Sequence, residues 1–257
     1  MRLATWNVNS VTARVPRLLA WLADVRPDVL ALQETKVPAD GFPAQEVEAL
    51  GYQVAAHGDG RWNGVALLSR VGLDDVRRGF DGDPGYPDAA TREPRAVSAT
   101  CGGVRVWSVY VPNGREPGHE HYTYKLRWLA ALRDVLATEP QPLVVMGDFN
   151  VAPTDDDVWD PPAFAHATHV TPPEREALAE IRALGLTDVI PRALKYDTPY
   201  TYWDYRAGMF PKNMGMRIDL VYASTLLAQR VTDAYVDREA RKGKGPSDHA
   251  PVVVDVV

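Results

Sequence analysis

The chain has 257 residues, with 28 lysines and arginines against 34 aspartates and glutamates, and a formal net charge of -6 at pH 7. Hydrophobic residues make up 46% and charged residues 24%, which is enough apolar side chain for a large core and excludes a disordered or fibrous chain. No run approaches the roughly 20 apolar residues of a membrane helix, so we expect no membrane association.

Short runs rich in valine, leucine and isoleucine recur along the chain and predict β-strands. In chain order the predicted strands span residues 2–8, 28–33, 52–56, 64–69, 96–101, 104–111, 142–148, 218–223, 231–236 and 251–256. Gly102 and Gly103 separate two of these runs and fit a two-residue hairpin. Hairpins combined with helical segments predict mixed sheets in an α/β fold.

Three helices are expected from apolar side chains at helical spacing. The first lies between Pro16 and Pro27, the second spans about 121–137, and the third begins at Pro173 and closes at Gly185. No repeat, low-complexity tract or break in composition divides the sequence. We therefore expect a single domain over residues 1–257.

The N-terminus and the cysteine content bear on the compartment. The first residues, MRLATWNVNS, lack the apolar region of a signal peptide, and Cys101 has no second cysteine with which to form a disulfide. We therefore expect a cytoplasmic protein. The net negative charge does not exclude a nucleic-acid partner, because recognition depends on where the charges lie.

Polar side chains cluster at the ends of the predicted strands. They are Asn7, Asn9, Glu34, Asp148, Asn150, Asp219, Asp248 and His249. Any one of them alone is a common turn or helix cap. If the strands that end at Asn7, Glu34 and Asp148 run antiparallel to those that begin near Asp219 and Asp248, all these side chains emerge at one edge.

Carboxylates gathered in one place repel each other unless a cation neutralises them. Mg²⁺ prefers oxygen ligands, usually one or two carboxylates together with water and a substrate phosphate. The sequence has no HExxH motif, no P-loop and no GxSxG elbow. The oxygen-rich set with a single histidine therefore indicates metal-assisted attack on a phosphate ester.

Seven motifs carry a resemblance to a known family. They are WNVNS at 6–10, LQETK at 32–36, YVPNG at 110–114, GDFN at 147–150, TYWDYR at 201–206, NMGMRID at 213–219 and SDHAP at 247–251. In order and spacing they resemble the exonuclease III type of abasic-site (AP) endonuclease, within the endonuclease/exonuclease/phosphatase superfamily. The resemblance implies a DNase I-like, four-layered α/β sandwich, in which two mixed β-sheets pack face to face with helices outside.

The resemblance also implies a metal site. Glu34 would be the principal Mg²⁺ ligand, with Asp248 and Asn7 near a second metal position, and Mn²⁺ is expected to substitute. The implied substrate is double-stranded DNA with abasic sites or blocked 3′ ends, cut 5′ to the abasic site, with 3′-to-5′ exonuclease and 3′-phosphatase activity besides. We expect the protein to act as a monomer.

Five residues match catalytic positions of the family. Asp148 would align or deprotonate the attacking water, and Asn150 would hold that water or the phosphate. Tyr110 would approach the phosphate or the leaving oxygen. Asp219 would orient His249, which would stabilise the pentacovalent centre; a carboxylate that accepts from one imidazole nitrogen favours the protonated ring.

Further residues match substrate-binding positions. They are Asn9, Lys36, Asn113, Tyr202, Trp203, Arg206, Asn213, Met216 and Ile218. Tyr202, Met216 and Ile218 would form a compact apolar pocket for a flipped sugar without a base. The alternative is that these aromatic residues, Trp203 included, pack in the core. Some relatives have tryptophan where this chain has Met216.

Two other functions stay open. The superfamily's shared motifs also fit a phosphomonoesterase for a small or lipid phosphate, although residues 201–219 argue against it. A catalytically silent DNA-binding module would have no physical need to gather carboxylates that repel each other. A tetrahydrofuran abasic duplex, tested with Mg²⁺ or EDTA, distinguishes these alternatives.

The charges are unevenly distributed along the chain. Residues 141–160 hold five acids and no base, whereas residues 238–244 hold four bases and one acid, and residues 205–217 hold three bases and no acid. We expect a basic face beside the DNA-reading motifs, opposite acidic loops. The histidines at 57, 119, 121, 166 and 169 and the acids at 155–157 are interpreted as hydrogen-bonding or capping residues rather than metal ligands.

Overall fold

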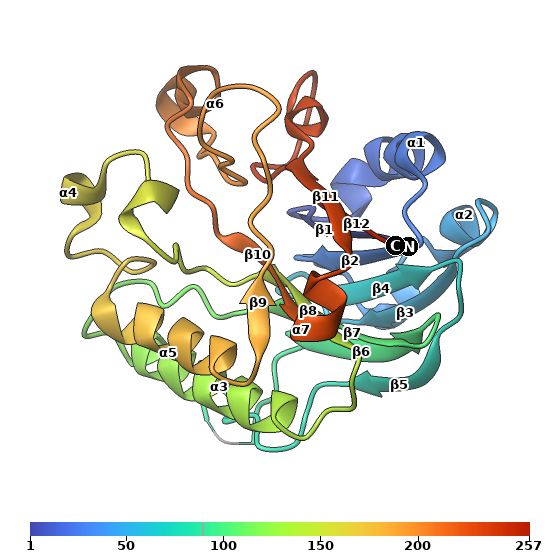
Figure 1. Cartoon of the computed structure of the whole chain (residues 1–257), viewed down its shortest axis with the longest axis horizontal. Helices are drawn as coiled ribbons and strands as arrows, with labels where there is room; N and C mark the ends of the chain where they lie inside the picture. The colour runs from blue at the N-terminus through green and yellow to red at the C-terminus, as the bar shows by residue number, and fades with distance from the viewer. Residues whose placement is uncertain (89) are drawn as a thin grey trace.

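The computed structural model describes residues 1–88 and 90–257, and it contains two six-stranded sheets that pack face to face (Figure 1). The strands of the first sheet, in spatial order, are β11 (Val231–Val236), β12 (Val252–Val256), β1 (Arg2–Asn7), β2 (Val29–Gln33), β4 (Val65–Ser69) and β3 (Gln53–His57). The strands of the second sheet are β5 (Asp74–Arg78), β6 (Ala96–Cys101), β7 (Val104–Tyr110), β8 (Leu143–Asp148), β10 (Asp219–Ser224) and β9 (Leu186–Asp188).

Within residues 1–88 and 90–257, three helices have more than two turns. They are α1 (Val15–Val25), α3 (Glu120–Leu136) and α5 (Pro172–Arg182), and the shorter ones are α2 (Ala44–Glu48), α4 (Pro161–Phe164), α6 (Met209–Lys212) and α7 (Thr225–Ala228). In α5, Thr171 and Glu174 form a capping box, which satisfies backbone N–H groups that the first turn leaves without a partner. No helix in these described ranges is long and apolar enough to cross a membrane.

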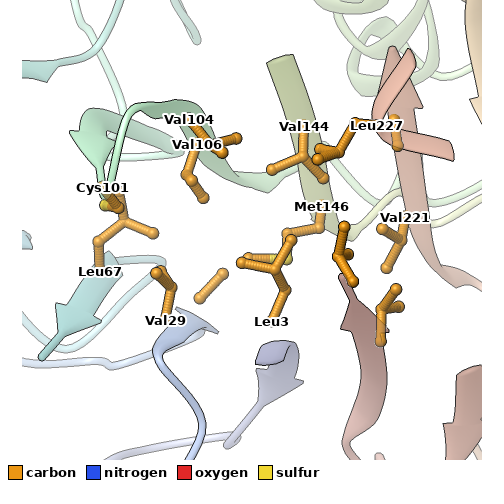
Figure 2. Packing of buried hydrophobic residues seen from close by; sticks show 14 of the residues in the cluster. Leu3, Val29, Leu67, Cys101, Val104, Val106, Val144, Met146, Val221 and Leu227 are labelled. Atoms are coloured by element: carbon orange, nitrogen blue, oxygen red, sulfur yellow. The ribbon is translucent and has the colours of Figure 1, made fainter. Parts of the chain in front are cut away.

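The space between the two sheets is filled by branched aliphatic side chains. Leu3, Val29 and Leu67 point from the first sheet toward Val106 and Met146 of the second (Figure 2). All five are at most 1% exposed. Because successive side chains of a strand alternate between faces, the other face of each sheet must be covered by helices.

Two further clusters provide that cover. Trp21 and Leu22 of α1 pack on the outer face of the first sheet, and Trp128 and Leu132 of α3 pack on the outer face of the second. Helix α5 packs beside α3 (Figure 1). The expected four layers, helices outside two mixed sheets, are therefore confirmed.

The strand directions place the polar strand ends together. β1 runs parallel to β2 and antiparallel to β12, and β8 runs antiparallel to β10. In the second sheet Asp148 lies directly opposite Asp219, and Tyr110 lies opposite Asp148 on the other side. The antiparallel arrangement that the sequence analysis required for a common edge is thus present.

All ten predicted strands and all three predicted helices are present, but two strands were missed. β5 has the sequence DDVRR and is almost wholly exposed at the edge of its sheet, so it shows no apolar alternation. β9 has only three residues, which is too short for a pattern. Both strands form because the backbone N–H and C=O groups of a neighbouring strand, β6 or β10, hydrogen-bond with them. This pairing depends on tertiary structure and leaves no pattern in the local sequence.

His121 makes the stability of the fold depend on pH. Its ring is buried in the first turn of α3, where Nδ1 accepts a hydrogen bond from the Gly114 N–H at 3.1 Å and the ring contacts Tyr86 and Tyr124. Burial, reinforced by the positive charges of Arg95 and Arg115, lowers the pKa of His121 to about 4. In the unfolded chain the pKa returns to about 6.5.

The unfolded state therefore binds more protons than the folded state between these two pKa values. We predict that the free energy of unfolding falls as the pH is lowered from 6.5 toward 4, and that the contribution is fully present above pH 6.5. Urea denaturation at a series of pH values measures it. The variant His121→Gln should show a shallower pH dependence over the same range; an unchanged slope would contradict the prediction.

Candidate active site

The candidate site lies where β1, β2, β7 and β8 end and where β10 and β12 begin. The first and last strands are tied together at this edge, because Trp6 Nε1 donates to the His249 carbonyl at 3.2 Å and Ser247 Oγ donates to the Asn7 carbonyl at 2.6 Å. Residues 240 positions apart in the sequence are thereby held in contact. The rigid strand ends fix the backbone from which the functional side chains project.

Asn7 lies between the two central carboxylates. Its Nδ2 donates to Glu34 Oε1 at 2.8 Å and to Asp148 Oδ2 at 2.9 Å. Its Oδ1 accepts from the Asn9 N–H at 3.0 Å. The amide hydrogens thus offset part of the repulsion between two carboxylates, and the amide oxygen faces away from them.

Two residues after Asn7 and Glu34, a second group of polar contacts forms. Lys36 Nζ lies 2.8 Å from Glu34 Oε2 and contacts Asn9 Oδ1, while Asn9 Nδ2 donates to Asp248 Oδ1 at 3.0 Å. Burial tends to raise the pKa of Glu34, but Lys36 and Asn7 outweigh it and lower that pKa overall. Glu34 is therefore ionised at neutral pH.

His249 is held by Asp219. Its Nδ1 lies 2.8 Å from Asp219 Oδ2, which also accepts from Thr201 Oγ1 at 2.6 Å, and its Nε2 lies 3.9 Å from Asp148 Oδ2. Burial disfavours the charged ring, but Asp219 and Asp148 outweigh it and raise the pKa of His249 to about 10. The ring is therefore a charged hydrogen-bond donor that faces Asp148.

Asp148 is buried, with 1% of its surface exposed. Burial, together with the negative charges of Asp219 and Glu34, raises its pKa above the ordinary carboxyl range even though His249 opposes the shift. A carboxylate with a raised pKa is a stronger base than a solvated one. The position suits proton transfer from water.

Tyr110 and Asn150 complete the centre. Burial and the nearby Glu34 raise the pKa of Tyr110 well above its ordinary value, so its hydroxyl keeps its proton and can donate. Asn150 donates from its backbone N–H to Asp148 Oδ1 at 2.9 Å, and its Oδ1 accepts from Asn113 Nδ2 at 3.2 Å. The amide of Asn150 is thus fixed beside Asp148.

The donor set fits a divalent cation that prefers oxygen. One ligand atom each of Glu34, Asp148 and His249 lies within 4.8 Å of the others. Because His249 is held protonated by Asp219, the carboxylates of Glu34 and Asp148 are the groups able to bind the ion. Asp219 Oδ1 is buried, has no hydrogen-bond partner among the described residues and adds further negative charge. Asp248 lies at the margin, with its Oδ1 held by Asn9.

Tyr202, Met216 and Ile218 lie together beside this centre. They pack in one apolar cluster, and the Tyr202 ring lies 4.9 Å from the His249 ring, measured between centroids. Met216 and Ile218 are 4% and 3% exposed, so Tyr202 offers most of the accessible surface of the three. The expected grouping is present next to His249.

Trp203 is a packing residue, which corrects the expectation that it binds substrate. It is 1% exposed, its ring contacts Phe210, and its Nε1 donates to Asn213 Oδ1 at 3.3 Å. A side chain on Gly215 would come within 2.6 Å of the same Nε1. The buried Trp203 therefore holds the loop that follows Tyr202, whereas the contact of the half-buried Asn213 with substrate stays a prediction.

The expected basic face is smaller than the sequence suggested. Arg217 is buried between Asp157 and Asp188, and Arg238 and Arg241 are buried against aromatic rings, including that of Phe210. The exposed bases of these segments are Arg206, Lys212, Lys242 and Lys244. Arg206 is itself paired with Asp204. Three of the seven bases thus stabilise the loops and are not available to a polyanion.

Sequence reasoning missed two polar residues that support the site. Thr201 donates to Asp219, and it belongs to the TYWDYR motif without having been assigned a role. Lys125 donates to the Asn150 carbonyl from the middle of α3. The sequence contained an indication of this role: Lys125 stands four residues before Leu129 on the apolar face of that helix, and a lysine is unusual at a buried position.

We predict that Asp219→Asn lowers the pKa of His249 from about 10 toward or below its ordinary value, because burial then opposes the charged ring with less compensation. An NMR titration of the His249 ring in the metal-free protein measures the change. The variant Thr201→Val removes the hydroxyl but keeps the carboxylate, so it should produce a smaller shift. An equal pKa in Asp219→Asn and the wild type would contradict the assignment.

Comparison with known proteins agrees with this geometry. The chain is 33% identical to exodeoxyribonuclease III of Haemophilus influenzae over 98% of both chains. It superposes on the 3′ phosphatase NExo from Neisseria, solved with a product DNA hairpin, with a TM-score of 0.94 and 38% identity over 100% of this chain and 99% of that one. An AP endonuclease from Archaeoglobus fulgidus gives a TM-score of 0.93 and 35% identity with the same coverage.

The family assignment covers nearly the whole sequence. Residues 4–249 match the endonuclease/exonuclease/phosphatase family. That range begins in β1 and ends at His249, so it includes the carboxylates, the amides and the histidine described above. The protein belongs to the endonuclease/exonuclease/phosphatase family.

Proposed function

We propose that this protein is a metal-dependent DNA repair nuclease that hydrolyses the phosphodiester 5′ to an abasic site in double-stranded DNA. We further propose that it trims blocked 3′ ends by 3′-to-5′ exonuclease and 3′-phosphatase activity, acting as a monomeric single domain. The observation that carries the proposal is the convergence of Glu34, Asp148 and the Asp219–His249 pair at one sheet edge. The names of its relatives, an exodeoxyribonuclease III, a 3′ phosphatase and an AP endonuclease, support the choice of substrate.

Glu34 would be the principal ligand of the metal ion, for which we propose Mg²⁺, with Mn²⁺ as a substitute, and the negative charge of the nearby Asp148 would help to attract the ion. When bound, the ion supplies positive charge to the phosphoryl oxygens and offsets the repulsion between the carboxylates. Lys36 contributes a second positive charge beside Glu34. Asn7, which donates to both carboxylates, keeps their oxygens at a fixed separation.

The residues of the chain itself supply the remaining chemistry. Asp148, whose pKa is raised by burial, accepts a proton from the attacking water. His249, held protonated by Asp219, donates a charge-assisted hydrogen bond to the phosphoryl group as negative charge develops there. Tyr110 and Asn150 donate neutral hydrogen bonds that orient the phosphate and the water.

Substrate selection is assigned to the apolar cluster beside His249. Tyr202, backed by Met216 and Ile218, would contact the sugar of an extruded nucleotide. Extrusion costs a few kcal/mol and least where the base is already missing, so a small apolar wall favours an abasic nucleotide. The exposed bases Arg206 and Lys212 would contact the phosphate backbone and make binding salt-sensitive.

The proposal is tested with a duplex that carries one tetrahydrofuran abasic analogue and with a nicked duplex that ends in a 3′-phosphate, each with Mg²⁺ or EDTA. We expect Mg²⁺-dependent incision of the first and phosphate release from the second. An inositol phosphate serves as the competing substrate. Phosphate release from it, without cleavage of either DNA, would reject the nuclease assignment in favour of a small-molecule phosphatase.

For the general base, we predict that Asp148→Asn lowers kcat by at least about 100-fold, because the amide cannot accept the proton from water. DNA affinity in a gel-shift assay should change little, since Asp148 makes no expected contact with the phosphate backbone. A comparable loss of affinity would show that Asp148 acts in binding instead.

For the metal site, we predict that Glu34→Ala raises the Mg²⁺ concentration needed for half-maximal activity by about 10-fold or more, because the principal carboxylate ligand is lost while the negative charge of Asp148 still attracts the ion. Activity should recover in part at high Mg²⁺. The measurement is a metal titration of the cleavage rate. A rate that is low at every Mg²⁺ concentration and does not rise with it would count against Glu34 as a ligand.

A further inference from the structure

A lysine is completely buried in the middle of α3. Lys125 is 0% exposed, and its Nζ donates to the Asn150 carbonyl at 2.7 Å and to the Asn113 carbonyl at 3.2 Å, besides contacting Glu174. Removing an ammonium group from water costs several kcal/mol unless its partners are well placed. The two carbonyls it binds belong to two different loops of the active site, one after β7 and one after β8.

Glu174 balances the charge of Lys125 and is itself fully satisfied. It is 0% exposed and accepts from the backbone N–H of His169 and of Thr171, each at 3.0 Å, and from Thr171 Oγ1 at 2.6 Å. It serves at the same time as the capping-box residue of α5. The ion pair therefore joins α3 to α5 and lies directly beneath the loop that carries Asn150.

Asn150 is the residue that this arrangement holds. Its φ of 51° lies in the left-handed region, which asparagine adopts more readily than most residues other than glycine, and hydrogen bonds to its carbonyl and side chain hold it in this turn. Its carbonyl accepts from Lys125 and also contacts His169 Nδ1 at 2.5 Å. Burial lowers the pKa of His169 to about 4, so the ring is neutral, and its Nδ1 must carry the hydrogen because a carbonyl only accepts.

The side chain of Asn150 is fixed from the other end. Its Nδ2 donates to the Val111 carbonyl at 3.0 Å, and its Oδ1 accepts from Asn113 Nδ2. Lys125 also steadies the Asn113 loop, where a Cβ on Gly114 would come within 3.1 Å of the lysine Cδ and 2.6 Å of Thr168 Oγ1. Only glycine permits the loop to approach the lysine this closely.

We propose that Lys125 and His169 are positioning residues of the nuclease centre, which hold the Asn150 backbone in its left-handed turn and so aim its amide at the substrate beside Asp148. The inference builds on the proposed nuclease function. A pair of buried charges is seldom needed for stability alone, since a neutral pair of similar volume is often as stable. Here Lys125 donates hydrogen bonds to the backbone carbonyls of Asn113 and Asn150, so the buried charge helps to set the geometry of the site.

The test replaces both charges together, Lys125→Met with Glu174→Gln, so that no unpaired charge is left in the core. We expect kcat on the abasic-analogue duplex to fall by about 10- to 100-fold, with KM within about 3-fold, because a displaced catalytic group lowers the rate without removing binding contacts. The control is Arg105→Met with Glu139→Gln. This buried pair joins Arg105 Nε to Glu139 Oε2 at 2.9 Å, and Arg105 lies at the opposite end of β7 from the site. Replacing it should leave kcat unchanged at a similar cost in stability.

A double-mutant cycle separates positioning from a general structural effect. In an Asn150→Ala background, the Lys125/Glu174 change should reduce kcat by less than about 3-fold, because the group being positioned is already gone. An equal reduction in both backgrounds, or a folded Lys125/Glu174 variant with the wild-type kcat, would overturn the proposal.

Two further measurements keep the test decisive. Should the Lys125/Glu174 variant fail to fold, His169→Gly removes one donor at a residue whose φ of 86° suits glycine, and a kcat reduction of about 3-fold or more with unchanged KM is expected. NMR of the Asn150 side-chain amide needs no substrate. Its resonances should shift in the Lys125/Glu174 variant and in His169→Gly, and stay in place in the Arg105/Glu139 control. Unchanged resonances in the first two variants reject the positioning role. A wild-type protein that cleaves no DNA rejects only the proposed function.

Discussion

Mutual repulsion among buried carboxylates is the constraint on which this structure depends. Glu34, directly after β2, and Asp148 and Asp219, within β8 and β10, project into one small volume, where a low dielectric strengthens every charge interaction. Three neighbouring groups reduce this repulsion. The amide of Asn7 lies between Glu34 and Asp148, Lys36 is paired with Glu34, and the protonated His249 is paired with Asp219. The negative charges that destabilise the folded state also raise the pKa of His249, which keeps its ring charged, and the pKa of Asp148, which makes it a stronger base.

The support for this centre extends well beyond the residues that would touch a substrate. Thr201 fixes Asp219, and the Lys125–Glu174 pair fixes the turn at Asn150. These residues come from a loop before β10 and from two helices outside the second sheet. The helical layer therefore does more than cover apolar surface, because it supplies donors to carbonyls at the end of β8. This explains why a buried lysine occurs on the apolar face of α3.

The sequence predicted the architecture well because apolar periodicity is a local signal. The strand-end acids and amides were also found, since each stands directly after or before an apolar run. The solvent exposure of individual side chains was harder to predict from the sequence than the strands and helices were. Arg217, Arg238 and Arg241 looked like a DNA-binding face, yet each is buried by partners distant in the sequence, such as Asp188 for Arg217. The burial of Trp203 was hard to predict for the same reason, because its packing partner Phe210 lies in α6, a helix of four residues that is too short to show a periodic pattern.

The pairing of β1 with β12 also governs when the protein can become active during synthesis. Asn7 leaves the ribosome early, whereas His249 and the strand that anchors it emerge more than two hundred residues later. Contacts of such high sequence separation form late and slowly, because a long loop must close before they contribute. A nascent chain that ends before β12 lacks the ring that faces Asp148 and the neighbour on which β1 depends. The candidate site is therefore assembled only when β12 pairs with β1, which makes its formation one of the late steps of folding.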